Sequence, residues 1–305
     1  TNAGDAVDFK IMRAPVSDPS RENWEEWLPH EAGTYIVDFV TFKDRLVRLE
    51  RENALPRIVV SDYAQDDVYE IDFDGAAYHL GLSPSFEFDT ANLRFTYESP
   101  ATPEQIFDFD MSSRERVLRK TEEVPSGHDP ELYAVERLFI TADDSAEVPV
   151  TVLRLKSTPV DGTAPLLLYG YGSYGATMPA WFSTNILSLV DRGVVYAVAH
   201  IRGSSARGRQ WYLDGKLDKK KNSFSDFANA AEELQERGYG RKGETVIYGG
   251  SAGGLLVGAT LNLRPDLFGG AIAAVPFVDV INTISDAELP LTPPEWVEWG
   301  DPIND

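Results

Sequence analysis

Residues 244–263, ETVIYGGSAGGLLVGATLNL, decide the fold of this chain. An apolar run ends in glycines, Ser251 follows them, and a second apolar run begins directly behind it. The first run is typical of a buried strand, and the second is long enough for a helix. Residues 249–253, GGSAG, match the pattern Gly-x-Ser-x-Gly at the junction. We therefore expect a tight strand-to-helix turn that exposes the Ser251 hydroxyl above a sheet.

This turn provides the parts of a nucleophilic site. The glycines beside Ser251 remove the Cβ atoms that would clash in a strained turn, which favours a nucleophile over a glycine-rich turn packed for steric reasons. Ala252 begins the helix, so its N–H can bind a developing oxyanion. A second donor is expected from residues 170–175, GYGSYG, where flanking glycines let Tyr171 approach the site. The alternative for Tyr171 and Tyr174 is that they are packing aromatics.

Strands and helices alternate on both sides of the turn, after a linker at residues 126–130. A hairpin is expected from residues 138–141 and 148–155. Further strands are expected at 165–169, 193–200, 244–248 and 270–275, and helices at 182–192, 224–237 and 252–263. This alternation predicts an α/β fold with a mostly parallel sheet and helices on both faces.

The first part of the chain repeats at intervals of 48 residues. One series comprises residues 9–16, 57–63 and 105–111, and a second comprises 38–50 and 86–98. A period of 40 to 50 residues with about four short strands per unit predicts β-propeller blades. A small β-sandwich is the alternative. About two and a half blades are present, which would leave strand edges exposed, so we expect residues before Thr1 to be missing.

The predicted organisation is therefore an incomplete α/β-hydrolase domain, residues 128–305, preceded by part of a β-propeller, residues 1–127. The composition, 43% apolar and 25% charged, is ordinary for a globular protein. No apolar run approaches the roughly 18 residues that span a bilayer, so no membrane partner is predicted. The absence of cysteines excludes disulfides and Cys-based metal sites, and suits the cytoplasm. No cofactor or metal is predicted.

The net charge of −21, from 49 acidic and 28 basic side chains, argues against binding of nucleic acid through phosphates. It would suit the attraction of cationic substrates, although a solubilising acidic surface is the favoured explanation of the charge. We interpret residues 219–221, KKK, as a solvated turn rather than a binding patch.

Five stretches carry a family resemblance: LLLYGYGSYGA, LSLVDRGVVYAVAHIRG, GRQWYLDGKLDKKKNSFSDF, GGSAGGLLVGA and VPFVDVINTISDAELPLT. They resemble the prolyl oligopeptidase family, and within it oligopeptidase B. The resemblance implies a cytoplasmic serine oligopeptidase whose propeller caps the active site and admits short peptides. It implies Ser251 as nucleophile of an acyl-enzyme, with the Ala252 N–H and the Tyr171 hydroxyl as oxyanion hole.

Members of the family carry the catalytic His and Asp on later loops, beyond the point where this chain ends. The histidines here are His30, His79, His128 and His200. His200 ends a predicted strand and Asp279 follows another, but both are poor substitutes for the missing pair. The chain alone should be nearly inactive, with a residual of roughly 10³ to 10⁴ over water. Its expected partner is the missing remainder of the same polypeptide.

The resemblance also implies cleavage after Arg or Lys, through two acidic residues. Glu295 aligns with the first, whereas Val297 aligns with the second and Glu298 is adjacent. A second acidic pair, which favours dibasic sites, aligns with Pro179 and Trp181, so that preference should be weakened. The alternatives are an esterase or acylaminoacyl peptidase on the same scaffold, and a non-catalytic interaction module that keeps the serine turn as a relic.

Overall fold

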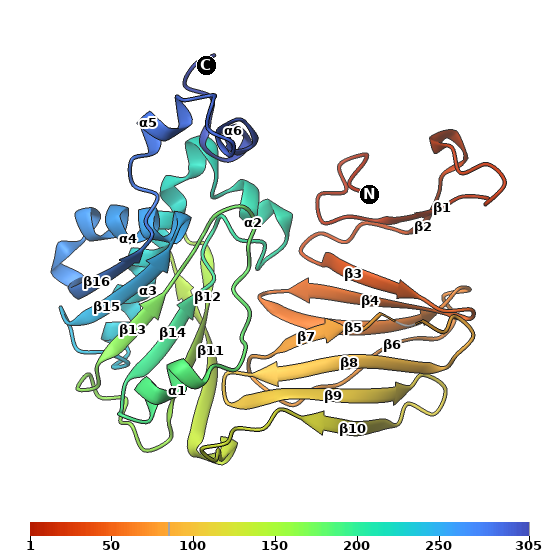
Figure 1. Cartoon of the computed structure of the whole chain (residues 1–305), viewed down its shortest axis with the longest axis horizontal. Coiled ribbons are helices and arrows are strands. Elements are labelled where there is room, and N and C mark those ends of the chain that lie inside the picture. Colours follow the sequence, from red (N-terminus) through yellow and green to blue (C-terminus); the bar gives the residue numbers. More distant parts are fainter. Residues whose placement is uncertain (85, 305) are drawn as a thin grey trace.

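A computed structural model describes residues 1–84 and 86–304. Antiparallel sheets built from the first part of the chain lie beside an α/β domain built from the rest (Figure 1). The predicted boundary between residues 127 and 128 lies in the segment that joins the last strand of these sheets, which ends at Thr121, to the first strand of the α/β domain, which begins at Tyr133. Asp305, the last residue of the second predicted domain, lies outside the described residues.

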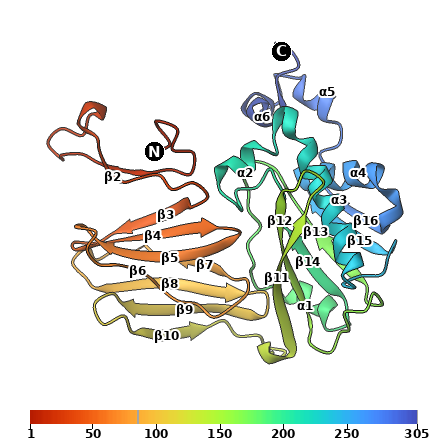
Figure 2. The same cartoon turned by 180° about the vertical axis from the view of Figure 1, so that it is seen from behind.

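The predicted blades are two four-stranded antiparallel sheets with their strands in chain order. One contains β3 (Tyr35–Thr41), β4 (Arg45–Glu52), β5 (Leu55–Asp62) and β6 (Val68–Glu70), and the other β7 (His79–Leu82), β8 (Asn92–Ser99), β9 (Thr102–Asp110) and β10 (Arg116–Thr121). A separate pair, β1 (Ile11–Arg13) and β2 (Glu25–Leu28), precedes them (Figure 2). Four strands per unit and an incomplete first unit were both predicted from the 48-residue repeat, and both are confirmed.

The two blades share one apolar core because alternate residues of their strands point inward. Val47, Ile58 and Val60 of the first blade pack in one cluster with Leu93 and Phe95 of the second, and all are almost fully buried. This period of two is what a strand with one buried face requires.

The α/β domain has a six-stranded sheet in the order β11-β12-β14-β13-β15-β16. Its strands are β11 (Tyr133–Thr141), β12 (Glu147–Leu155), β13 (Leu166–Tyr169), β14 (Val195–Ala199), β15 (Thr245–Gly250) and β16 (Phe268–Ala274). The first two form the predicted hairpin, β12 pairs antiparallel to β14, and the remaining pairs are parallel. The predicted mostly parallel sheet is confirmed.

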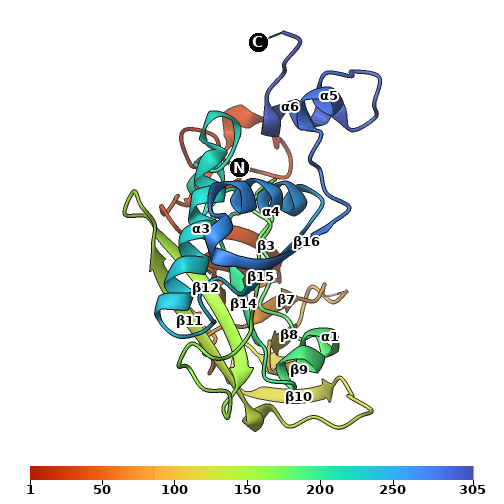
Figure 3. The same cartoon turned by 90° about the vertical axis from the view of Figure 1, so that its left-hand side faces the viewer.

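Helices cover both faces of this sheet (Figure 3). Val150 and Val152 of β12 pack in the core that contains α3 (Lys221–Glu236) and α4 (Ala252–Leu263), whereas Leu153, the next residue of the strand, packs with α1 (Thr184–Val190). The short helices α2 (Arg209–Leu213), α5 (Val280–Ile284) and α6 (Thr292–Trp299) lie beyond one end of the sheet. No helix among the described residues is long and apolar enough to cross a membrane.

The strand β16 is an open edge of the sheet. It pairs only with β15 on one side, and Ile272 in its middle is 49% exposed. An unpaired, partly apolar edge is one that further chain normally covers. The open edge therefore agrees with the predicted incomplete α/β-hydrolase domain.

The turn between β4 and β5 connects the blades to the α/β domain. Asn53 and Ala54 both have positive φ, 50° and 65°, which suits the tight turn of a hairpin. The N–H of Ala54 donates to the carbonyl of Ala206 at 2.7 Å, and Arg137 donates to the carbonyl of Asn53 at 3.0 Å. At this turn the blades are thus joined to the α/β domain through main-chain atoms, and elsewhere through side chains such as Glu98, which accepts from the Phe182 N–H at 2.8 Å.

A substitution at Gly203, which lies in the loop after β14, tests how closely the loops above the sheet are packed. A Cβ at this position would lie 1.9 Å from the carbonyl oxygen of Gly172, and φ is +91°. Gly193 is the matched control, because its φ is +87° but no atom lies within 4 Å of its Cβ position. Gly193→Ala should cost about 1 to 2 kcal/mol from backbone strain alone, and Gly203→Ala several kcal/mol. Thermal unfolding of the full-length variants measures both, and equal losses would contradict this packing.

Candidate active site

Ser251 occupies the strained turn that the sequence predicts. Its φ of 56° and ψ of −120° lie in a region that residues with a Cβ rarely adopt, and its side chain is exposed. The turn is held by hydrogen bonds from the Ser251 N–H to the Ala274 carbonyl, 2.9 Å, and from the Phe277 N–H to the Ser251 carbonyl, 3.0 Å. A Cβ at Gly249 would lie 2.2 Å from the carbonyl of Gly253, so a glycine is required there.

The two predicted oxyanion donors lie beside this serine. Ala252 is the first residue of α4, where N–H groups have no acceptor within the helix. The Tyr171 hydroxyl lies close enough to the Ser251 side chain for a hydrogen bond between them to affect the pKa of Tyr171. Burial raises the pKa of Tyr171, an effect reinforced by Glu295 and Glu298 and opposed by that hydrogen bond. Tyr171 therefore stays protonated at neutral pH and can donate a hydrogen bond to an oxyanion.

Close packing of glycines brings Tyr171 to the serine. A Cβ at Gly170 would lie 2.6 Å from the ring of Phe227, and one at Gly172 would lie 2.6 Å from the side chain of Ile201. Gly172 also has a φ of +71°. The loop between β13 and α1 can thus sit directly on the body of the domain, as the flanking glycines predicted.

Helix α6 places Glu295 near these groups. Glu295 is half-buried in the first turn of the helix, and its charge contributes to the raised pKa values of Tyr171 and Tyr174. Within residues 1–84 and 86–304 the Glu295 carboxylate has no ion-pair partner. Val297 is 67% exposed. One unpaired carboxylate therefore lies close to the serine site.

Glu298 cannot supply the second carboxylate. It is 1% exposed, and its two oxygens accept hydrogen bonds from the Tyr212 hydroxyl, 2.8 Å, and from the Tyr174 N–H, 3.1 Å. Because Glu298 is adjacent to Val297 in the sequence, it was a possible substitute for the acid that is missing there. Its burial prevents it from contacting a substrate.

Lys220 corrects a sequence-based prediction. Its side chain is only 12% exposed rather than solvated, and its Nζ lies 2.6 Å from both the Gly172 carbonyl and the Ser173 hydroxyl. Burial lowers the pKa of Lys220 to about 8, although Glu298, 3.4 Å away, opposes the shift. The interpretation of residues 219–221 as a solvated turn is therefore wrong for Lys220.

The short distance between Ser173 and Lys220 does not make a second nucleophilic site. A lysine with a depressed pKa beside a serine can act as its base. Ser173, however, is completely buried, so no substrate carbonyl can reach its hydroxyl. Ser251, by contrast, is exposed and lies beside Tyr171 and the start of α4.

Sequence profiles of one family match both parts of the chain. The N-terminal β-propeller domain of prolyl oligopeptidase matches residues 1–122, and the prolyl oligopeptidase family matches residues 180–305. The chain belongs to the prolyl oligopeptidase family. Dipeptidyl aminopeptidase BI of Pseudoxanthomonas mexicana is 43% identical to this chain, and the match covers 99% of this chain and 42% of that relative. Protease 2 of Moraxella lacunata is 38% identical over 99% of this chain and 43% of that relative.

The structure agrees with this membership of the prolyl oligopeptidase family. Oligopeptidase B from Leishmania major superposes with a TM-score of 0.91 and 38% identity, over 99% of this chain and 43% of that one. The chain thus spans less than half the length of the relatives it matches. The fold predicted from the repeats and the serine turn, part of a propeller followed by an incomplete α/β-hydrolase domain, is confirmed.

None of the four histidines is placed as a base for Ser251. His30 lies 3.9 Å from Asp8, His128 contacts the Ala101 carbonyl, and His79 lines a cavity between the blades and the α/β domain. His200 is buried with its Nε2 2.9 Å from the Thr151 hydroxyl. The exposed Asp279 bonds to the amide of Asn282 in its own helix turn. In the described part of the chain, no cluster of three His, Asp or Glu side chains suits a metal ion.

Pro179 and Trp181 lie against the propeller rather than in an acidic pocket. With His200 they line a cavity of about 70 Å³ that also touches Pro100 of the blade region. Trp181 is 54% exposed. The positions that align with the family's second acidic pair are thus apolar and sit at the contact between the two parts of the chain.

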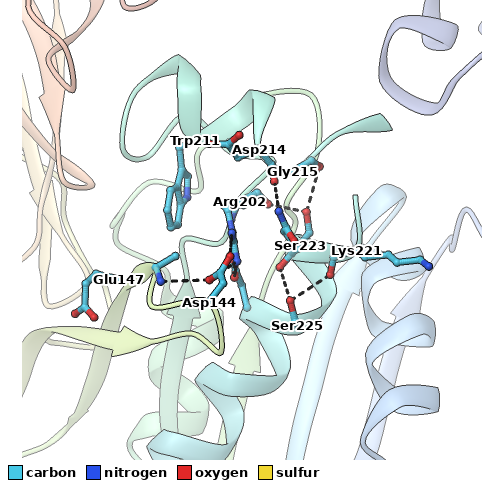
Figure 4. A network of polar contacts seen from close by, with 12 residues as sticks. Asp144, Glu147, Arg202, Trp211, Asp214, Gly215, Lys221, Ser223 and Ser225 are labelled. Atoms are coloured by element: carbon cyan, nitrogen blue, oxygen red, sulfur yellow. Dashed lines mark hydrogen bonds and ion pairs between the residues drawn. The ribbon is translucent and has the colours of Figure 1, made fainter. Parts of the chain in front are cut away.

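Beneath the loop that carries Tyr171, the buried Arg202 forms an ion-pair network (Figure 4). Its guanidinium bonds to Asp226 of α3, with Nε 2.9 Å from Oδ2, and to Asp144 of the β11–β12 turn, with Nη1 2.5 Å from Oδ2. The Ser223 hydroxyl donates to the carbonyl of Arg202 at 2.8 Å and lies 3.4 Å from that of Gly172. The network joins the loop after β14 to the loop that carries Tyr171.

His200 makes the stability of the protein depend on pH. Burial, with a smaller effect from Arg51 and Arg137, lowers its pKa from 6.5 to about 4. Between these values the unfolded chain binds a proton that the native protein does not, so stability is lost as the pH falls through this window, by about 3 kcal/mol in total. In full-length protein, the deficit in melting temperature of His200→Gln against the wild type should therefore shrink from pH 7 to pH 4.5. A deficit that is independent of pH would contradict the assignment.

Proposed function

We propose that the complete protein containing this chain is a serine oligopeptidase that hydrolyses short peptides after Arg or Lys through an acyl-enzyme on Ser251. The observation that carries the proposal is the strained, exposed Ser251 at the start of α4, with the side chain of Tyr171 close enough for Ser251 to affect its pKa. A serine turn without donors would have no means to stabilise a tetrahedral intermediate.

In this mechanism the Ser251 oxygen attacks the carbonyl carbon of the scissile bond. The carbonyl oxygen becomes an oxyanion that accepts hydrogen bonds from Ala252 and Tyr171. A histidine takes the serine proton and gives it to the leaving amine. In the second half of the reaction the histidine takes a proton from water, which attacks the ester of the acyl-enzyme, and then gives that proton to the Ser251 oxygen. We expect this histidine and its aspartate in the remainder of the polypeptide, because the four histidines of this chain and Asp279 are not placed to act on Ser251.

The preference for a basic side chain rests on Glu295. Its carboxylate has no cationic partner among the described residues, and it lies close enough to Tyr171 to affect the pKa of that hydroxyl. A single carboxylate can pair with a guanidinium or ammonium group, but more weakly than two. The net charge of −21 would favour the approach of cationic peptides.

The principal partner of this chain is the remainder of its own polypeptide, which we expect to cover the open edge of β16 and the exposed apolar residues near it, such as Val275 and Val278. We expect no nucleic-acid or membrane partner, and action in the cytoplasm, which suits a chain without cysteines.

Covalent labelling tests the nucleophile. Full-length protein treated with a fluorophosphonate should gain one adduct, located on Ser251 by peptide mass spectrometry, and lose its peptidase activity in proportion. Ser251→Ala should take up no label and retain about 10⁻⁴ or less of the activity. Labelling at another serine, or none at all, would refute the proposal.

A substrate panel separates the alternatives. Chromogenic peptides ending in Arg, Pro or acylated Ala, dipeptides with a free N-terminus, and simple esters should be compared on the same enzyme. Selective hydrolysis of simple esters would favour an esterase, and selective release of acyl-Ala an acylaminoacyl peptidase. Absence of all turnover in the full-length protein would favour a non-catalytic interaction module.

Charge removal at position 295 tests the basis of substrate choice. Glu295→Gln keeps the volume and removes a free carboxylate near the site, so kcat/KM for an Arg substrate should fall about 10- to 100-fold, corresponding to a charge-assisted contact of about 1.5 to 3 kcal/mol. The kcat/KM for a matched substrate in which neutral citrulline replaces the arginine should change less than about threefold. Equal losses on both substrates would show that Glu295 does not select the basic side chain.

A further inference from the structure

Glu298 and Lys220 meet at the loop that carries Tyr171, although they come from different elements. Glu298 belongs to α6, and Lys220 directly precedes α3. Both are buried, at 1% and 12% exposure of their side chains. A buried charge pair is costly unless its hydrogen bonds are satisfied. Here they are satisfied by residues 172–174 and by Tyr212.

The main chain on the C-terminal side of Tyr171 is held by these two side chains. Lys220 donates to the Gly172 carbonyl and to the Ser173 hydroxyl, both at 2.6 Å. Glu298 accepts from the N–H of Tyr174 at 3.1 Å. Tyr174 has a φ of 60°, a conformation that an unsupported tyrosine would leave. The loop conformation therefore depends on the Glu298–Lys220 pair.

The same helix also holds the side chain of Tyr174. The indole N–H of Trp299 donates to the Tyr174 hydroxyl at 3.1 Å, and the two rings meet edge to face with centroids 5.9 Å apart. Glu295, three residues before Glu298, lies on the first turn of this helix. The helix that carries the free carboxylate is thus anchored to the loop that carries the oxyanion hydroxyl.

We propose that Glu298, together with Lys220, is a positioning residue that holds the Tyr171 hydroxyl against the oxyanion and links it to the helix that carries Glu295. This inference rests on the proposed function, because it assigns the pair a part in the same hydrolytic site. Neither side chain touches the substrate. Their effect on the reaction passes through Tyr171.

The variant Glu298→Gln of the full-length protein tests this role. Glutamine keeps the shape and one acceptor for Tyr174 but removes the charge that faces Lys220. We expect kcat for an Arg peptide to fall about 10- to 100-fold, while KM changes less than about threefold, because the loss concerns stabilisation of the transition state. Glu298→Asp, which restores the charge, should recover part of kcat.

A double-mutant cycle with Tyr171→Phe separates positioning from a purely structural role. Tyr171→Phe alone should lower kcat about 10²- to 10³-fold. In that background Glu298→Gln should have little further effect, because the hydroxyl that it positions is gone. If the two losses multiply, or if Glu298→Gln leaves kcat unchanged, the positioning role is refuted.

Glu50→Gln is the matched control for removing a buried, ion-paired carboxylate. Glu50 is 3% exposed in β4 and bonds to Arg48 and Arg57, away from the serine turn. The variant Glu50→Gln should have a lower melting temperature, and its kcat should stay within about twofold of that of the wild type. A fall in kcat comparable with that of Glu298→Gln would mean that general destabilisation explains both variants.

The rate of fluorophosphonate labelling distinguishes failure of this inference from failure of the proposed function. If the wild type labels at Ser251 and cleaves peptides but Glu298→Gln behaves like the wild type in both assays, only the positioning role fails. If the wild type labels at Ser251 without cleaving peptides, the proposed substrate class fails, and a labelling rate lowered at least about tenfold in Glu298→Gln still supports the positioning role. If the wild type does not label, both are refuted.

Discussion

The turn at Ser251 places a residue with a side chain at a φ of 56°, and its surroundings keep it there. The Ser251 N–H bonds to Ala274 at the end of β16, and the Ser251 carbonyl bonds to Phe277 in the segment that follows. Gly249 lies so close to the carbonyl of Gly253 that no Cβ would fit there. Strain of this kind persists only when the surrounding structure over-determines it. The sheet order, the start of α4 and the approach of the Tyr171 loop all serve to hold this one hydroxyl in an exposed position.

Above the turn, the site is assembled from loops that hold one another. Arg202 with Asp226 and Asp144 fixes the loop after β14, and Ser223 joins this loop to Gly172. Lys220 and Glu298 then fix the next residues of the Tyr171 loop from the other side. Pre-organised donors of this kind stabilise developing charge without a reorganisation cost at the moment of reaction.

Local patterns in the sequence predicted the local features of the structure. The glycines around Ser251 specify a turn, the expected helix at 252–263 is α4, and the 48-residue repeat specifies four strands per blade. Lys220 was missed because its burial depends on Glu298, 78 positions later, whereas its neighbours in the sequence are charged and exposed. The role of Glu298 was equally hidden, since the sequence offers a row of acidic and aromatic residues with no sign of which face inward. Helix ends shifted by a few residues where caps decide them, as at Ser183, whose hydroxyl starts α1 two residues later than expected.

The contact between the blades and the α/β domain through Asn53 and Ala54 has a consequence for protein engineering. Hydrogen bonds from main-chain atoms do not depend on side-chain identity, so they survive exchange of the surrounding blade surface as long as the turn keeps its left-handed geometry. Blades from distant homologues could therefore be grafted onto this α/β domain if an Asn-Gly or similar dipeptide is kept at the hairpin tip. Such chimaeras would change the blades that lie beside the α/β domain while leaving the residues of the Ser251 turn untouched.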